Sequence, residues 1–262
     1  MDSKTAAAYL ARLAVPADTR ADAAGLRRLH HAHQVAVPFE NLSIHLSESI
    51  SLAEDELVAK IVTRRRGGLC YELNGLFAAL LESLGATVRL LGGRVYGQSG
   101  FGPPFDHLAL IVTGTDGSGP WLADVGFGSH STYPLLLDSP AEQQDPGGVF
   151  VLTQAADGDL DVLKNGRPHY RLEMRPRVLE DFLPTCWYQQ TSPASNFTQG
   201  TICSRLTDDG RVSIAGRTLI RTSAGQRTEE QLVGDEDLLA AYRELFGIEL
   251  PAVPLIPAAA VS

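Results

Sequence analysis

One cysteine in this sequence stands where a glycine-rich turn leads into a predicted helix. Cys70 follows Arg66-Gly67-Gly68-Leu69, and apolar residues at helical spacing continue to Leu84, with Gly85 as a stop signal. The free N–H groups and the dipole at a helix N-terminus stabilise an anion, and the thiolate is the nucleophilic form of cysteine. Arg66 adds positive charge, and the two glycines leave backbone amides free to bind a developing oxyanion. The pattern predicts a thiol nucleophile.

The alternative for Cys70 is a buried, unreactive thiol, the common state of a cysteine in a soluble protein. Such a residue does not need paired glycines before it. Glu72 and Asn74 also put polar groups on the first turn of an otherwise apolar helix. Two interpretations of Glu72 stay equally open: it belongs to the reactive site, or it is an acid that complements the helix N-terminus.

A cysteine that performs acyl chemistry needs an imidazole within reach, and a carboxylate or amide that orients the imidazole. His107 is the best candidate among seven histidines, because it opens an apolar run that ends at Thr113. A glycine-rich turn at residues 114–119 and a second apolar run at residues 121–125 follow. Together these features predict a β-hairpin.

The register of this hairpin decides whether His107 meets a carboxylate. If Thr113 pairs with Pro120, Asp124 is the diagonal neighbour of His107 on one sheet face, about 7 Å away at Cβ. A slip of one residue would put the two side chains on opposite faces. Asp124 also interrupts an apolar strand, where an unpaired carboxylate is costly. The pattern predicts a Cys70, His107 and Asp124 triad; the alternative is an exposed histidine and a turn-proximal aspartate.

The other six histidines receive no catalytic role. A helix is predicted to carry three of them on its solvated face; a metal cluster is the alternative, but no carboxylate stands at ligand spacing. These three are His30, His31 and His33. The remaining three, which fall in loops or at strand edges, are His45, His130 and His169.

The elements that must position these residues change character along the chain. Helical patterns cover residues 5–13, 21–36 and 70–84, and Ser51 with Glu54 forms a capping-box signature for a further helix. Pro38 marks an extended or turned connection. Residues 138–148 are expected to form an exposed loop. Short β-type runs suggest a small antiparallel barrel or sandwich. These runs are residues 87–95, 107–113, 121–125, 149–152 and 160–163.

A third portion of the chain begins near Thr185. It contains strand patterns at residues 201–206 and 217–222, and it ends in an amphipathic helix from Asp235 to Phe246. Asp235 is predicted to cap this helix and Gly247 to stop it.

Composition excludes several classes of protein. The chain has 262 residues, with 22 Lys and Arg against 31 Asp and Glu, so its formal charge of −9 disfavours nucleic acid and anionic membranes as partners. Three widely spaced cysteines, Cys70, Cys186 and Cys203, suggest neither a disulfide framework nor a zinc site. No apolar run approaches the ~20 residues of a membrane span, and no secretory signal opens the chain. We expect a cytoplasmic protein without a metal.

With these residues placed, the chain resembles the arylamine N-acetyltransferase family over nearly its whole length. Each matching segment is short, but six of them occur in the family's order. They are Val37–Leu42 (VPFENL), Arg66–Asn74 around the cysteine, Gly93–Val95, Asp106–Leu108 around the histidine, Asp124–Gly128 (DVGFG) and Thr191–Phe197 (the TSPxSxF pattern).

The resemblance implies an α+β fold in three domains with a papain-like catalytic core. These would be a helical domain, 1–86, that carries the nucleophile; an antiparallel β-barrel domain, 87–184, that carries the histidine and aspartate; and an α/β lid, 185–262.

The resemblance also implies the reaction and its participants. Cys70 would take an acetyl group from acetyl-CoA and pass it to the nitrogen of an arylamine or arylhydrazine, with His107 handling protons and Asp124 orienting His107. Phe127 would line the acceptor pocket, with Phe39 and Phe197 as further walls unless they are only core residues. The donor would contact the backbone at Gly93, Val95, Gly126 and Gly128, although glycines of this kind more often mark turns.

Three other functions use related residues. An amide synthase on the same fold would take an acyl chain from a carrier-protein thioester and form a macrolactam. A thiol hydrolase of papain or transglutaminase type would pass the acyl group to water, a chemistry that does not require the VPFENL, DVGFG and TSPxSxF segments. A binding protein with an inactive site would lack one member of the triad, and all three members are present.

Overall fold

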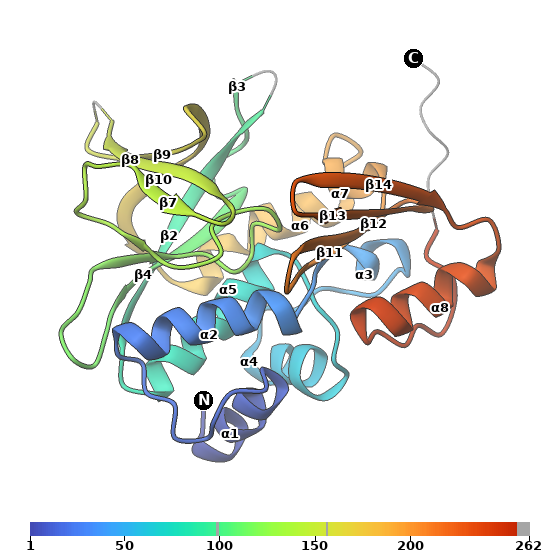
Figure 1. Ribbon diagram of the computed structural model, residues 1–262, viewed down its shortest axis with the longest axis horizontal. Coiled ribbons are helices and arrows are strands. Elements are labelled where there is room, and N and C mark those ends of the chain that lie inside the picture. The colour runs from blue at the N-terminus through green and yellow to red at the C-terminus, as the bar shows by residue number, and fades with distance from the viewer. Residues whose placement is uncertain (98–99, 156, 256–262) are drawn as a thin grey trace.

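Two antiparallel sheets lie side by side over a group of helices in the computed structural model (Figure 1). The structure describes residues 1–97, 100–155 and 157–255. The helices come mainly from the first third of the chain, the larger sheet from the middle, and the smaller sheet from the last third together with one short N-terminal strand.

The N-terminal helices begin where the sequence offers caps. α1 (Ser3–Arg12) and α2 (Ala23–Ala36) follow Asp2 and Asp22, whose carboxylates accept the backbone N–H groups of Thr5 and Gly25. α5 (Cys70–Ser83) ends before Gly85, which has a φ of +90° that suits glycine. The helices predicted at residues 5–13, 21–36 and 70–84 are confirmed within two residues.

The predicted capping box at Ser51 and Glu54 is wrong. The chain stays extended as far as Ala53, so α4 (Glu54–Leu57) starts too late for Ser51 to cap it, and Ser51 Oγ accepts the N–H of Ala53 instead. α4 continues directly into a π-helix, Val58–Thr63, and the short α3 (Leu42–His45) precedes both.

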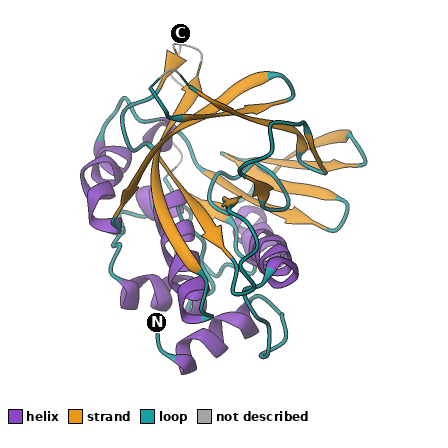
Figure 2. Ribbon diagram, turned by 90° about the vertical axis from the view of Figure 1, so that its left-hand side faces the viewer, coloured by secondary structure: helices purple, strands orange, loops and turns teal. Residues whose placement is uncertain are grey.

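The larger sheet curves into a nearly closed barrel (Figure 2) with the strand order β6-β5-β4-β2-β10-β9-β8-β7, and β3 pairs with β2. All neighbours are antiparallel. Its strands are β2 (Thr87–Gly97), β3 (Gly100–Phe101), β4 (His107–Thr113), β5 (Trp121–Ala123), β6 (Leu135–Leu136), β7 (Gln143–Asp145), β8 (Gly148–Gln154), β9 (Leu160–Lys164) and β10 (Arg167–Arg177).

One long strand of this sheet was not predicted. β10 contains Pro168 and Pro176 and many charged residues, which hide the strand pattern, yet Tyr170 and Leu172 are buried and the strand pairs with both β2 and β9. The ladder shifts register next to each proline. The expectation of an exposed loop at residues 138–148 is wrong in part, because β7 lies within it and pairs with β8.

The smaller sheet has the order β1-β11-β12-β13-β14, and β1 (Phe39–Glu40) joins it from the N-terminal part. The other strands are β11 (Ile202–Thr207), β12 (Gly210–Ala215), β13 (Thr218–Ser223) and β14 (Gln226–Gln231). A 3₁₀-helix (Leu179–Phe182), α6 (Leu183–Thr191) and α7 (Asn196–Gln199) precede it, and α8 (Asp235–Phe246) follows.

The bounds of α8 are as predicted, but its cap is not. Gly234 is the N-cap, and the carboxylate of Asp237 accepts its N–H group at 3.2 Å, whereas Asp235 stands one position inside the helix and pairs with Arg217. Gly247 ends the helix in the left-handed conformation, with a φ of +66°. The prediction of Gly247 as the stop is confirmed.

β4 is buried on both faces, which explains its unbroken apolar sequence. Leu108, Leu110 and Val112 belong to the core that the helices form with the sheet, whereas Ala109 and Ile111 belong to the barrel interior. His107 therefore shares the barrel-interior face by alternation. A further cluster packs the smaller sheet against α8. The division into domains at residues 86 and 184 stays a prediction.

A buried ion pair holds the turn before Cys70. Arg66 Nε lies 3.0 Å from Glu40 Oε1 and Arg66 Nη1 lies 3.1 Å from Glu48 Oε2. The second oxygen of Glu40 accepts the N–H of Leu42 at 2.6 Å. Two carboxylates therefore offset the charge of Arg66, and the expectation that Arg66 adds positive potential at Cys70 is wrong. Its guanidinium joins the turn to β1 instead.

Replacing Arg66 by methionine would leave Glu40 buried without its cation. We expect the free energy of unfolding in urea to fall by about 3–5 kcal/mol. The control is Arg221→Met, because Arg221 pairs with Glu230 at 3.4 Å on the surface and its loss should cost about 1 kcal/mol or less. Equal losses in the two variants would contradict a structural role for the buried pair.

Candidate active site

Cys70 is the first residue of α5, as the sequence predicts, and only 4% of it is exposed. Its Sγ lies 3.9 Å from the backbone oxygen of Asp106. Leu69 precedes the helix and has no side chain that could cap it. The carboxylate of Glu72 accepts the Leu69 N–H at 2.9 Å and pairs with Lys60 Nζ at 2.6 Å. These contacts favour the interpretation of Glu72 as the acid that complements the helix N-terminus.

The two glycines before Cys70 are needed for close packing. A Cβ on Gly67 would lie 1.8 Å from the oxygen of Pro38, and one on Gly68 would lie 2.5 Å from Glu72 Oε2. The Gly68 carbonyl accepts the N–H of Glu40 at 3.0 Å. These contacts fix the path of the chain into α5. Oxyanion binding by the two amides stays a prediction.

The hairpin that carries His107 has the predicted register. Leu110 pairs with Ala123, and Val112 pairs with Trp121. β5 ends at Ala123, so Asp124 lies just beyond the ladder. His107 Nε2 is 2.7 Å from Asp124 Oδ2. The structure therefore brings the histidine and aspartate together as the sequence predicts.

Asp124 is buried in a set of hydrogen-bond donors. Its Oδ1 accepts Asn74 Nδ2 at 2.9 Å and the Gly126 N–H at 3.0 Å. Asn74 Nδ2 also donates to the Leu108 carbonyl at 2.6 Å, and Asn74 Oδ1 accepts the Val125 N–H at 2.9 Å. Asn74 lies one helical turn after Cys70 and thereby ties the cysteine helix to the histidine strand and the aspartate loop.

His30 is a residue of this site that the sequence prediction missed. Its Nε2 accepts the backbone N–H of Asp124 at 3.0 Å, and its Nδ1 donates to the Thr132 carbonyl at 3.0 Å. Burial lowers the pKa of His30 to about 4, so the ring stays neutral and can accept at Nε2. The loop that carries Asp124 is thus anchored to α2.

The prediction of a solvated face for His30, His31 and His33 is wrong for two of them. His30 and His33 are fully buried, and only His31 is partly exposed, stacked on Tyr133. His33 Nε2 hydrogen-bonds to Tyr9 Oη at 2.8 Å. Their burial could have been predicted from the sequence, because His30 and His33 continue the apolar stripe of Leu26 and Leu29 at i, i+3, i+4 and i+7.

The charges of the site favour an ionised pair. Burial by itself would lower the pKa of His107, but the Asp124 carboxylate, its hydrogen bond and the neighbouring Cys70 outweigh burial and raise the pKa to about 10. Burial would likewise raise the pKa of Asp124, but His107 and the donors around the carboxylate keep it below its usual range. His107 is therefore an imidazolium at neutral pH, and Cys70 lies close enough to contribute to its raised pKa.

This arrangement suits nucleophilic acyl transfer. An imidazolium beside a sulfur stabilises the thiolate, and a buried carboxylate holds the imidazolium in place. The Gly126 backbone packs directly over the cysteine, since a Cβ there would lie 2.7 Å from Cys70 Cα. Gly93 is equally constrained: it pairs with His107 across β2 and β4, and its Cβ would lie 3.1 Å from Leu172.

The three candidate aromatic residues lie in two groups. Phe127 packs against His107, with ring centroids 5.0 Å apart. Phe39 and Phe197 contact each other at 5.9 Å, and a Cβ on Gly128 would lie 3.1 Å from the Phe39 ring. Phe127 therefore lies beside His107, and the Phe39–Phe197 pair lies beside Gly128.

A cavity of about 760 Å³ opens beside this region. Val95 and Phe197 line it, together with Asp106, whose backbone oxygen contacts the cysteine. Burial raises the pKa of the Asp106 carboxyl to about 6, against the opposing effect of the Val95 N–H that it accepts at 2.8 Å. The cavity is large enough for a small substrate or part of a cofactor.

Two kinds of feature are absent from residues 1–97, 100–155 and 157–255. No group of three or more His, Cys, Asp or Glu side chains there is placed to hold a metal ion. None of the helices in these ranges has both the length and the apolar character required to cross a membrane.

Known proteins are similar to this chain in sequence and fold. Residues 22–255 match the model of an N-acetyltransferase family. The chain is 34% identical over 252 residues to an arylamine N-acetyltransferase of Mycolicibacterium smegmatis, covering 92% of this chain and 91% of that protein. It is also 34% identical over 232 residues to an arylamine N-acetyltransferase / N-hydroxyarylamine O-acetyltransferase of Salmonella typhimurium, covering 85% and 81%.

A solved structure has the same fold. It is the Mycobacterium marinum arylamine N-acetyltransferase in complex with CoA, which superposes with a TM-score of 0.85 at 32% identity, covering 92% of each chain. The predicted α+β fold is confirmed.

The contact between His30 and Asp124 can be tested by its effect on stability. His30→Leu would leave the Asp124 N–H buried without a partner and would remove one of the two donors to the Thr132 carbonyl, so we expect the free energy of unfolding to fall by about 1–3 kcal/mol. His31→Leu, at the neighbouring and partly exposed position, is the control and should change it by about 0.5 kcal/mol or less. A neutral His30→Leu would refute the anchoring role.

The ion pair at His107 predicts a pH dependence. The folded-state pKa of about 10 exceeds the ordinary value near 6.5, so the pair contributes stability that is complete below about pH 6.5 and lost as the pH rises toward 10. We expect the NMR signals of the His107 ring to titrate near pH 10, and to titrate at lower pH in Asp124→Asn. A wild-type ring that loses its proton below pH 7 would contradict this description of the site.

Proposed function

The chain belongs to the N-acetyltransferase family and is an acyltransferase, and from this premise we propose that it transfers an acetyl group from acetyl-CoA to the nitrogen of an aromatic amine or hydrazine. The observation that carries the proposal is the buried His107–Asp124 pair beside Cys70, which is the first residue of α5. The relatives' printed names support an arylamine as the acceptor, and the CoA complex supports CoA as the carrier.

The proposed reaction has two halves. The Cys70 thiolate attacks the carbonyl carbon of the thioester, the bond from that carbon to the CoA sulfur breaks, and His107 supplies a proton to the departing CoA thiolate. The acetyl group is then held as a thioester on Cys70, and His107 is neutral.

In the second half the amine nitrogen attacks the carbonyl carbon of acetyl-Cys70. His107 accepts a proton from that nitrogen, the carbon–sulfur bond breaks, and the Cys70 thiolate returns beside an imidazolium. Asp124 stays ionised throughout and holds the ring, while Asn74 and His30 hold Asp124. The nucleophile and the proton carrier are both side chains, so the proposed reaction requires no metal.

The binding assignments follow from the surroundings of Cys70. We propose Phe127, Phe39 and Phe197 as aromatic walls for the acceptor, because they lie on two sides of the Gly126–Gly128 segment. The donor would run past the backbone of Gly93, Val95, Gly126 and Gly128. Val95 supports this path, since it lines the 760 Å³ cavity beside the cysteine.

Labelling of the cysteine tests the first half of the reaction. Acetyl-CoA alone should leave one acetyl group on Cys70 in peptide mass spectra, and Cys70→Ala should take up none. Cys186→Ala is the matched control: Cys186 is also buried, and burial raises the pKa of its thiol to about 12, so its removal should leave labelling intact. Removing the proton carrier in His107→Gln should slow labelling by about 10²–10⁴-fold.

Discharge of the label tests the second half. An aniline or aryl hydrazide should remove the acetyl group much faster than water and yield the N-acetyl product. Equal discharge by water would identify a hydrolase. Failure of acetyl-, propionyl- and malonyl-CoA to label Cys70, with labelling by a carrier-protein thioester, would replace the proposal with the amide synthase.

A further inference from the structure

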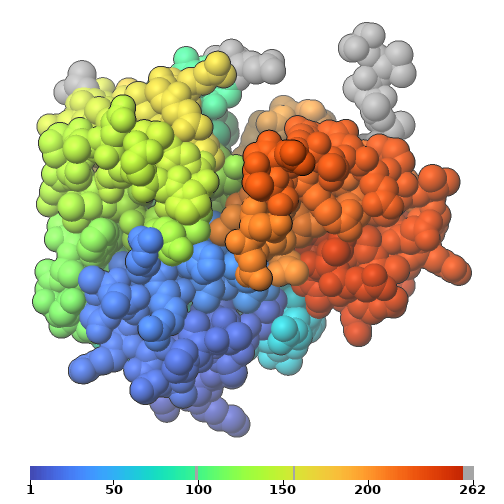
Figure 3. Space-filling model, viewed as in Figure 1, coloured from blue at the N-terminus to red at the C-terminus, as the bar shows by residue number. Residues whose placement is uncertain are grey.

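A second cavity, of about 500 Å³, lies between the barrel and the smaller sheet. In the space-filling view these parts form two lobes with a hollow between them (Figure 3). The barrel side of the lining comes from the segment after Gly128, the turn before β8 and the end of β9. The other side comes from the β11–β12 hairpin and β13 of the smaller sheet, and from His31 of α2. No residue assigned above to the reaction lines this cavity.

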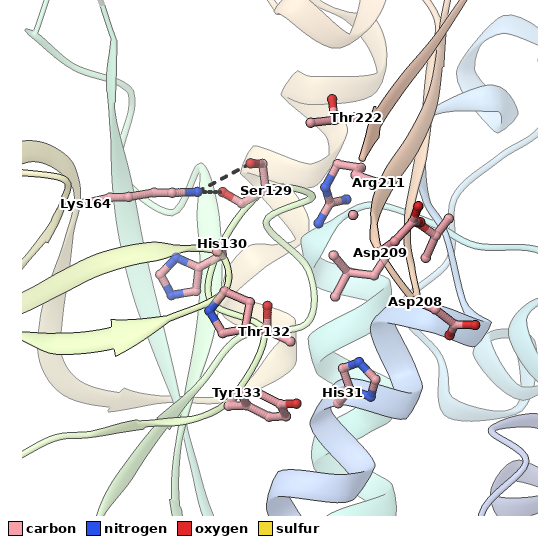
Figure 4. A pocket seen from close by; sticks show the side chains of 15 residues that line it. His31, Ser129, His130, Thr132, Tyr133, Lys164, Asp208, Asp209, Arg211 and Thr222 are labelled. Carbon is pink, nitrogen blue, oxygen red and sulfur yellow. Dashed lines mark hydrogen bonds between the residues drawn. The ribbon is translucent and has the colours of Figure 1, made fainter. Parts of the chain in front are cut away.

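Two cations face this cavity from opposite sides. Lys164 reaches in from the barrel, and Arg211 reaches in from the smaller sheet (Figure 4). Lys164 Nζ donates to the Ser129 carbonyl at 3.1 Å, and Arg211 Nη1 donates to Ser204 Oγ at 3.0 Å. Both of these partners are neutral.

Neither cation forms an ion pair with a carboxylate of the described residues. Asp208 and Asp209 also line the cavity, but Asp209 is engaged by the hydroxyls of Ser223 and Thr207 at the end of the hairpin. Two buried cations of this chain, Arg66 and Lys60, are each paired with a carboxylate. Lys164 and Arg211 instead line one cavity together without a carboxylate partner, so an anion bound between them would balance their charges.

The pKa values of the two cations also favour a bound anion. Burial lowers the pKa of Arg211 to about 10, and burial together with the positive charge of Arg211 lowers the pKa of Lys164. Two like charges that lose water without a counter-ion destabilise each other, and an anion bound between them would reverse this effect.

We propose that Lys164 and Arg211 form a binding site for a phosphate group. A phosphate presents several acceptor oxygens and up to two negative charges, which match a point-like ammonium, a forked guanidinium and the hydroxyls of Ser129 and Thr222 in the lining. A single carboxylate would leave one of the two cations unsatisfied.

The position of the cavity links this site to the proposed reaction. Ser129 follows the Gly126–Gly128 segment directly, and Gly126 packs over Cys70. A phosphorylated molecule held at Lys164 and Arg211 can therefore lie along this segment with its other end toward the cysteine. The phosphate has two sources: the nucleotide end of the acyl donor, which rests on the proposed function, or a separate phosphorylated small molecule.

Acyl donors with and without phosphate separate these sources. The variant Lys164→Gln/Arg211→Gln removes both cations, and the control Lys4→Gln/Arg64→Gln removes the same charge from two exposed residues outside the cavity. If the donor's phosphate binds here, the KM for acetyl-CoA should rise at least about tenfold in the first variant only. The rate with the phosphate-free donor S-acetyl-N-acetylcysteamine should not change in either variant.

Titration with inorganic phosphate, followed by NMR, covers the other source. If the KM for acetyl-CoA does not change, shifts of Ser129 and Arg211 signals in the wild type that vanish in Lys164→Gln would support a separate phosphorylated ligand. If the double variant does not fold, the KM for acetyl-CoA can be measured with Lys164→Gln alone. An unchanged KM together with no phosphate binding would overturn the proposal.

The same experiment keeps the two proposals apart. If neither acetyl-CoA nor S-acetyl-N-acetylcysteamine labels Cys70 in the wild type, the proposed function fails. If both donors label Cys70 and the two variants behave alike without binding phosphate, only the phosphate site fails.

Discussion

The buried carboxylate of Asp124 is the constraint on which the rest of the site depends. An ionised group in the interior of a protein is stable only when it is paired and hydrogen-bonded. Asp124 meets this requirement through His107, Asn74, and the Gly126 N–H, while its own N–H is held by His30. Each partner comes from a different stretch of chain, so satisfying one carboxylate brings α2, α5 and β4 into register with each other.

This requirement also explains where the reactive groups sit. Asn74 is one turn beyond Cys70 on α5, so the bond that anchors Asp124 also sets the distance of the cysteine helix from the histidine strand. The result is a thiol, an imidazolium and a carboxylate close together in the buried interior, where electrostatic effects are stronger than in water. The buried pairs Arg66–Glu40 and Lys60–Glu72 hold the turn before the helix in the same manner. Lys164 and Arg211 differ from these pairs because they line one cavity together and neither pairs with a carboxylate of the described residues.

Prediction from the sequence succeeded where a pattern is local. Helix α5, strand β4 and the hairpin register follow from apolar periodicity, and a register counted from one turn placed His107 beside Asp124. Sequence prediction failed where an element is stabilised by segments that are distant in the chain. β10 was missed because two prolines and its charges hide a strand that only pairing on both edges stabilises.

The histidines of α2 show the difference between what the sequence predicts and what only the tertiary structure decides. Sequence alone determined that Cys70 starts a helix and that the hairpin register brings Asp124 to His107, because helix ends and hairpin register depend on neighbouring residues. Only the tertiary structure decided that His30 is neutral and buried, that Arg66 is neutralised by Glu40 and Glu48, and that Lys164 faces Arg211 across a cavity. Burial and charge pairing are properties of segments that meet in space, and the spacing of residues along one segment does not contain them.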